Sequence, residues 1–243
     1  MELYEGVINQ FLTTLNKESI KQLKIPEDDW EDLGNQNMIL RSEMAYELGG
    51  GNLPAISSLC ITTKDSDVKE DEVDLVGEDL PQLTSDSPYA RLTILKVKEE
   101  GLGQADSLYQ AIQKLEFVRY HIHPKGYMMR ISSTKREPVR IGQQALNEGL
   151  DFAKVGKRFI KEYHQNQNVL AVKCIFITKP DFPYDKWKAI ADINETILTG
   201  IDHISKDFKM DCSVCQLKSV CDEVEGMKEY HFAQQNQLSS KGR

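Results

Sequence analysis

Hydrophobic side chains recur every three or four positions in several stretches of this chain, which is the spacing of a helix with one buried face. Residues 4–23 show this pattern and predict one amphipathic helix or two short ones. Residues 151–166 repeat it behind Asp151, a residue type that favours the N-cap position. The apolar stripe of this helix comprises Phe152, Val155, Phe159, Ile160 and Tyr163. Further helices are predicted at residues 107–117, 136–150 and 185–204.

Other stretches alternate between apolar and polar positions or are apolar throughout, as strands are. Residues 89–97 alternate and predict a well-buried strand, and residues 168–179 form an almost continuous apolar run that suits the middle of a sheet. Further strands are predicted at 71–77, at 126–133 and on both sides of a glycine break within 39–63. Because strands and helices alternate through the middle of the chain, the sequence predicts a layered α/β domain.

The glycine break consists of Gly49, Gly50 and Gly51, which allow positive φ and close approach of the backbone to a neighbour. No G-K-[ST] follows, so the run is not a P-loop, and it lacks the spacing of a dinucleotide-binding G-x-G-x-x-G motif. A tight turn between two strands is the favoured interpretation.

Composition and charge narrow the possible functions. The net charge of −8 argues against a dedicated nucleic-acid binder, because neutralising phosphates requires a basic surface. No apolar run approaches the ~20 residues of a membrane-spanning helix, and the first residues lack the order of a signal peptide. We therefore expect a cytoplasmic protein that contacts neither nucleic acid nor membrane.

Two charged segments stand out against this background. Residues 24–37 form an acidic, turn-rich connector. The helix at 151–166 carries a basic stripe, which is usually a solvated face but could also steer an acidic partner such as a ferredoxin. The stripe comprises Lys154, Lys157, Arg158 and Lys161.

Three of the five cysteines, Cys212, Cys215 and Cys221, form a C-x2-C-x5-C run. In a reducing compartment such a cluster indicates metal binding or redox chemistry more often than a disulfide. Neighbouring thiolates repel one another unless a cation or cluster offsets their charge. We predict that the three cysteines bind a metal or cluster. The alternatives are a redox-active C-x2-C pair without metal and the remnant of a lost site.

A closed zinc site and a cubane iron–sulfur cluster both require four ligands, so one ligand must come from elsewhere. Cys60, at the end of a predicted strand, and His231, ten residues after Cys221, are the candidates, with Asp211 a further possibility. Cys174 lies inside the apolar run of a predicted central strand and is interpreted as a buried, inert thiol. Because sulfur ligands dominate, a [4Fe-4S] cluster is favoured, with zinc as the alternative.

Several collinear stretches between about residues 41 and 225 resemble the beta subunit of the carbon monoxide dehydrogenase/acetyl-CoA synthase complex. "MAYELGGGNLPA" resembles the glycine-rich segment of that family, and "DEVDLVGEDLPQL" resembles a strand and turn, with Glu78 where proline is usual. "VRIGQQALNEGLDFAKVGKRFIKEY" resembles a helix pair, and "CSVCQLKSVC" resembles the start of the nickel–iron–sulfur site. The resemblance implies the α/β middle domain of acetyl-CoA synthase and makes Cys212, Cys215 and Cys221 candidate cluster ligands.

The sequence also departs from the family's pattern. The gap before Cys221 is shorter than in the family, no cysteine lies beyond it, and the cysteine-glycine-cysteine that holds the distal nickel is absent. Compared with that family, we also expect the amino-terminal region that meets the dehydrogenase to be missing. We therefore expect no complete acetyl-CoA synthase activity, and whether the chain is an enzyme stays open.

The resulting prediction is an iron–sulfur accessory protein of anaerobic one-carbon metabolism that docks a corrinoid protein, a ferredoxin or a methyltransferase. The alternatives are a reduced acetyl-CoA synthase-like enzyme with methyl- or acyl-transfer activity and a zinc-stabilised protein-interaction module. The predicted parts are an N-terminal helical segment with the acidic connector (1–38), the α/β domain (39–205), the cysteine-rich loop (206–232) and a flexible tail (233–243).

Overall fold

A computed structural model of the chain describes residues 4–102, 105–131 and 136–205. Tertiary contacts divide the chain into two compact units, Met1–Glu195 and Thr196–Arg243. The layers and sheets belong to the first unit. No helix among the described residues is both long and apolar enough to cross a membrane.

A five-stranded mixed sheet forms the centre of the first unit, in the order β1-β4-β8-β5-β3. The pairs β3–β5 and β4–β8 are parallel, whereas β5–β8 and β1–β4 are antiparallel. β8 lies in the middle, where an almost continuous apolar run can be covered on both faces. The strands are β1 (Lys21–Leu23), β3 (Ala55–Thr62), β4 (Glu72–Val76), β5 (Tyr89–Val97) and β8 (Val169–Ile177).

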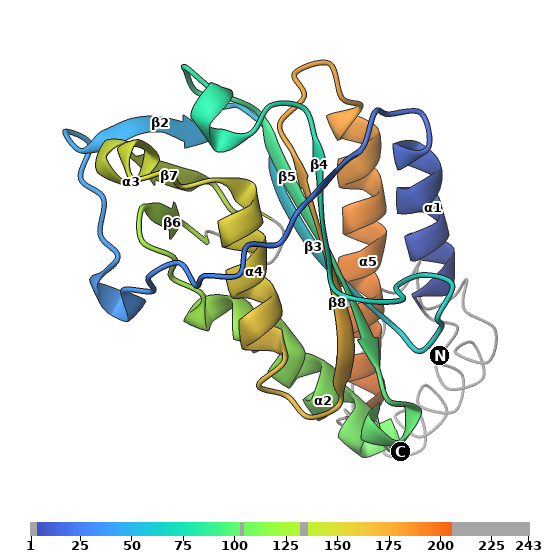
Figure 1. The fold of residues 1–243 in the computed structure, drawn as a ribbon. Coiled ribbons are helices and arrows are strands. Elements are labelled where there is room, and N and C mark those ends of the chain that lie inside the picture. The colour runs from blue at the N-terminus through green and yellow to red at the C-terminus, as the bar shows by residue number, and fades with distance from the viewer. Residues whose placement is uncertain (1–3, 103–104, 132–135, 206–243) are drawn as a thin grey trace, which may run out of the picture. The chain divides into compact units, whose positions relative to one another are not determined.

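Helices cover both faces of this sheet (Figure 1). On one face lie α1 and the part of α5 that precedes Thr196, joined by Phe11 and Trp187, whose ring centroids are 4.4 Å apart. α2 and α4 lie on the other face, where Gly156 of α4 packs directly on Val73 of β4. The predicted layered α/β fold is therefore confirmed. The helices are α1 (Glu5–Leu15), α2 (Ala105–Val118), α4 (Phe152–Tyr163) and α5 (Tyr184–Ser205).

A second, three-stranded antiparallel sheet has the order β2-β7-β6, and the short helix α3 follows β7. Its elements are β2 (Met44–Leu48), β6 (Tyr127–Met129), β7 (Val139–Gly142) and α3 (Gln143–Asn147). The predicted helix over 136–150 is wrong in its first half. Val139 and Ile141 alternate with Arg140, and this strand-like spacing lets β7 pair with a neighbour on each side.

The glycine run forms a tight turn between β2 and β3, as predicted. Gly49 and Gly51 have φ angles of +66° and +56°, which disfavour any other residue type. A Cβ on Gly49 would also lie 2.2 Å from the Cβ of Ala55. The Arg136 guanidinium donates hydrogen bonds to the carbonyls of both glycines, at 3.1 and 2.9 Å.

Short 3₁₀ turns complete the described structure. They lie at η1 (Gly34–Gln36), η2 (Leu80–Gln82), η3 (Glu99–Leu102) and η4 (Arg119–His121). The acidic connector, residues 24–37, joins β1 to the segment before β2 and crosses α4 on its way (Figure 1).

Candidate functional site

The predicted cluster ligands Cys212, Cys215 and Cys221 lie outside the described residues, as does His231. Their assignment as metal or cluster ligands stays a prediction. Within the described ranges, no group of three or more histidine, cysteine, aspartate or glutamate side chains could hold a metal ion.

Cys60, the other predicted fourth ligand, lies on β3 and is completely buried. Its Sγ is 3.5 Å from Oδ1 of Asn194, a side chain that also donates to the carbonyl of Leu59. Burial, reinforced by the carboxylate of Glu116, raises the pKa of the Cys60 thiol well above its usual range. The site therefore favours the neutral thiol, whereas metal ligation requires the thiolate.

Cys174 lies on β8 and is completely buried, which confirms its predicted place in a central strand. Burial raises the pKa of its thiol to about 12, although Arg91 and a hydrogen bond with Thr93 act in the opposite direction. A neutral, inaccessible thiol of this kind is chemically inert.

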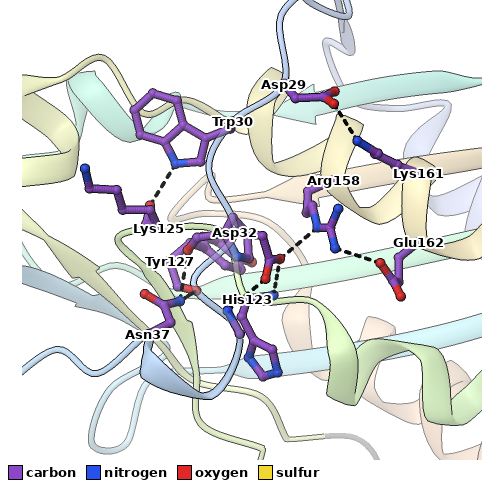
Figure 2. A network of polar contacts seen from close by, with 12 residues as sticks. Asp29, Trp30, Asp32, Asn37, His123, Lys125, Tyr127, Arg158, Lys161 and Glu162 are labelled. Carbon is purple, nitrogen blue, oxygen red and sulfur yellow. Dashed lines mark hydrogen bonds and ion pairs between the residues drawn. The ribbon is translucent and has the colours of Figure 1, made fainter.

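The connector and α4 meet in a network of ion pairs and hydrogen bonds (Figure 2). The carboxylate of Asp29 accepts from Lys157 at 3.0 Å and from Lys161 at 2.5 Å. Lys157 also donates to the backbone carbonyl of Glu27, at 2.5 Å. These contacts lower the pKa of Asp29 to about 2, chiefly through the hydrogen bonds from Lys161 and Lys157.

Trp30, the next residue of the connector, binds beside this ion-pair cluster. Its indole Nε1 donates to the carbonyl of Lys125 at 2.9 Å, and the ammonium of Lys154 lies 4.9 Å from the centre of its ring. A lysine over an indole face is a cation–π contact, which is strongest on tryptophan. Three of the four residues in the predicted basic stripe therefore already contact residues 27–30 of the same chain.

The fourth residue of the stripe, Arg158, binds the inner part of the connector. Its Nε donates to Asp32 at 2.7 Å, and its Nη2 donates to Glu162 at 2.7 Å (Figure 2). Asp32 also accepts from the backbone N–H groups of Gly34, at 2.9 Å, and His123, at 3.0 Å. Partial burial opposes ionisation of Asp32, but these backbone donors and Arg158 outweigh it and lower its pKa.

Beyond Asp32 the connector is part of the fold itself. The buried side chain of Asn37 donates to the carbonyls of Pro124 and Tyr127, both at 2.9 Å, and accepts from Gly126 N–H at 3.2 Å. The connector thus has an outer half, by which we mean residues 27–31, and an inner half, residues 32–37. Lysine side chains, the Trp30 indole and one backbone hydrogen bond, from Lys125 N–H to the Glu31 carbonyl at 2.8 Å, hold the outer half, whereas backbone and buried contacts hold the inner half.

A second charged pair, which no pattern in the sequence indicated, lies in the interior. Arg91 of β5 and Glu137, just before β7, are 2% and 0% exposed and 2.8 Å apart. Arg91 also donates to Thr93 at 2.7 Å and lies 4.3 Å from the ring centre of Phe159. Burial disfavours the charged guanidinium, but the Glu137 carboxylate outweighs it and raises the pKa of Arg91. This pair joins the large sheet to the small one.

Comparison with protein families gives one result that covers most of the α/β unit. The family model described as the CO dehydrogenase/acetyl-CoA synthase complex beta subunit matches residues 34–181, which is more than half of the chain. The matched region includes α4 but neither residues 27–31 nor the cysteine run. No curated protein matches this sequence significantly. The match agrees with the resemblance noted in the sequence and with the α/β layers, and the chain belongs to the family of CO dehydrogenase/acetyl-CoA synthase complex beta subunits.

Proposed function

We propose that this chain is an iron–sulfur accessory protein of CO dehydrogenase/acetyl-CoA synthase-type one-carbon metabolism. The observation that carries the proposal is the family match over residues 34–181, which relates the folded unit to a subunit of that complex. We assign metal binding to the cysteine run, which lies outside the matched region. The proposed role combines a cluster with a surface that binds a second protein.

The proposed cluster is a [4Fe-4S] centre bound by Cys212, Cys215 and Cys221. Three thiolates on a short segment are suited to it, because sulfur ligation by cysteine is the rule for such clusters. As the fourth ligand we favour His231 over Cys60, because the surroundings of Cys60 stabilise its neutral thiol. An iron with a non-cysteine ligand has an altered reduction potential, which suits electron relay.

The proposed partner is a soluble electron carrier such as a ferredoxin, or a corrinoid protein or methyltransferase. Membership of a family of complex subunits supports a protein partner in general. The basic side chains on α4 favour a partner with an acidic surface, because opposite charges speed encounter and fix orientation.

The proposal is tested on full-length protein purified without oxygen, by measuring iron and sulfide and recording electron paramagnetic resonance spectra after reduction. We expect about four iron atoms per chain, the content of a cubane cluster. Cys215→Ser should remove the iron and the signal, whereas the matched variant Cys174→Ser should retain both, because Cys174 lies in the core. One bound zinc without iron, or unchanged iron in Cys215→Ser, would contradict the proposed cluster.

A further inference from the structure

The basic face of α4 is already occupied. Each of its four cationic side chains contacts the connector, and Asp29 alone bridges Lys157 and Lys161. A partner that approaches the folded chain therefore meets the carboxylates of the connector and not a basic stripe. If α4 is a docking surface, the connector has to leave it first.

The outer half of the connector is suited to leaving. Asp29 is about half exposed, at 51%, and so is Lys161, at 47%. Asp28 is exposed and makes no ion pair or hydrogen bond within the part of the chain that the structure describes. Exposed ion pairs are individually weak and are screened by salt. Residues 27–31 therefore leave α4 far more easily than the core packing opens.

The inner half of the connector stays anchored when residues 27–31 leave α4. Asp32 is held by two backbone N–H groups and by Arg158, and Asn37 is buried with three hydrogen bonds. At the other end, β1 pairs with β4 in the large sheet. The outer half can therefore detach as a loop between two anchored ends, without unfolding either sheet.

We propose that residues 27–31 are a removable cover on α4, and that an acidic segment of a partner protein binds α4 by displacing them. This inference rests on the proposed docking role and adds the chemistry of the partner. Residues 27–31 indicate the chemistry of the partner segment, which we expect to carry a tryptophan flanked by carboxylates. In the chain itself Trp30 lies against Lys154, and Asp29 lies between Lys157 and Lys161. The family match covers α4 and begins after the cover, at residue 34.

The test uses a fluorescently labelled peptide of residues 26–32, "PEDDWED", titrated into the full-length chain and followed by fluorescence anisotropy. The tethered cover has an effective concentration on the order of millimolar, so the wild-type chain should bind the free peptide weakly. Asp29→Asn/Trp30→Ala weakens the cover by removing two ion pairs and the tryptophan contacts. We expect this variant to bind the peptide about tenfold more tightly at low salt.

Two further variants decide whether α4 is the site. Adding Lys157→Gln and Lys161→Gln to the weakened variant should abolish the gain, because the peptide then lacks the cations that Asp29 uses. Asp28→Asn changes the same charge one residue away and should bind as the wild type does, because Asp28 makes no ion pair or hydrogen bond among the described residues. Equal binding by wild-type and weakened chains, or binding that survives loss of both lysines, would overturn the proposal.

The peptide test requires neither iron nor the exclusion of oxygen, so it is independent of the proposed cluster. Tighter binding by the weakened variant, together with the absence of iron from protein purified without oxygen, supports the covered docking surface while contradicting the proposed iron–sulfur role. Iron binding with no difference in peptide affinity between the variants supports the cluster and overturns the cover.

Discussion

Two groups of opposite charges contribute to holding this chain together, and they differ most in burial. Arg91 and Glu137 are 2% and 0% exposed and lie between the two sheets. Asp29 and Lys161 pair at 2.5 Å, but both are about half exposed. An ion pair in water is weak because solvent competes for each charge, whereas a buried charge that loses its counter-charge has no water to replace it. The interior pair therefore fixes the fold, and the surface pairs hold a segment that can detach.

The largest effect is expected from breaking the interior pair. Glu137→Gln keeps the shape of the side chain and leaves the guanidinium of Arg91 buried without its counter-charge. Removing one partner of a buried pair costs about 3 to 5 kcal/mol, and we expect a loss of this size in the free energy of unfolding, measured by urea titration.

The control is the double variant Arg91→Met/Glu137→Leu, which replaces both charges by apolar side chains. It should be more stable than Glu137→Gln, because no unpaired charge is left in the core. If Glu137→Gln unfolds at the same urea concentration as the wild type, the buried pair contributes no more to stability than the exposed pairs do, and the comparison fails.

The ion pair between Arg158 and Asp32 tests an intermediate degree of burial. The two side chains are 19% and 20% exposed, between the interior pair and the outer half of the connector. We expect Arg158→Gln to lower the free energy of unfolding by about 1.5 to 3 kcal/mol, as for a hydrogen bond to a charged group. The measurement is again a urea titration.

Arg158→Lys is the matched variant, because it keeps the positive charge and removes the planar guanidinium with its several N–H donors. A single ammonium does not reproduce the planar geometry with which Arg158 contacts Asp32 and Glu162 together. We expect it to recover only part of the loss. Full recovery would show that charge alone holds this position, as on the exposed part of α4.

The helices and strands of this fold can be predicted from the sequence wherever a strong local pattern is present. An N-cap and an apolar stripe predict the helix after Asp151, and the Asp151 side chain does accept from Lys154 N–H at 2.8 Å. The almost continuous apolar run, interrupted only by Lys173, predicts β8. Four residues of alternation beside a helix-like stretch are too short a signal to predict β7, and only pairing with β2 and β6 makes them a strand.

The contacts between charged segments cannot be predicted in the same way. The sequence predicts the strand that contains Arg91, but the partner Glu137 is 46 positions away, and no local pattern connects them. The acidic connector and the basic stripe are each visible in the sequence, and their opposite charges are the one available signal that they meet. That signal does not show whether the basic side chains of α4 bind a partner protein or residues of the same chain.

The smallest effect is expected from titrating the outer half of the connector. The pKa of Asp29 falls from 3.8 to about 2 when it pairs with Lys161 and Lys157. A lowered pKa stabilises the paired state above 3.8, and this contribution disappears as the pH falls through about 2. Acid should therefore release residues 27–31 from α4 in this range.

Tryptophan fluorescence can follow this release, because Trp30 lies on the connector and Trp187 is completely buried. We expect a change in emission between pH 3.8 and about 2 that is displaced to higher pH in Lys161→Gln, since Asp29 then loses the lysine that lowers its pKa most. Trp30→Phe should show no such change while the core around Trp187 stays folded. A transition that persists in Trp30→Phe would report unfolding of the core around Trp187. Release of residues 27–31 and unfolding of the core would then occur together and not as separate steps.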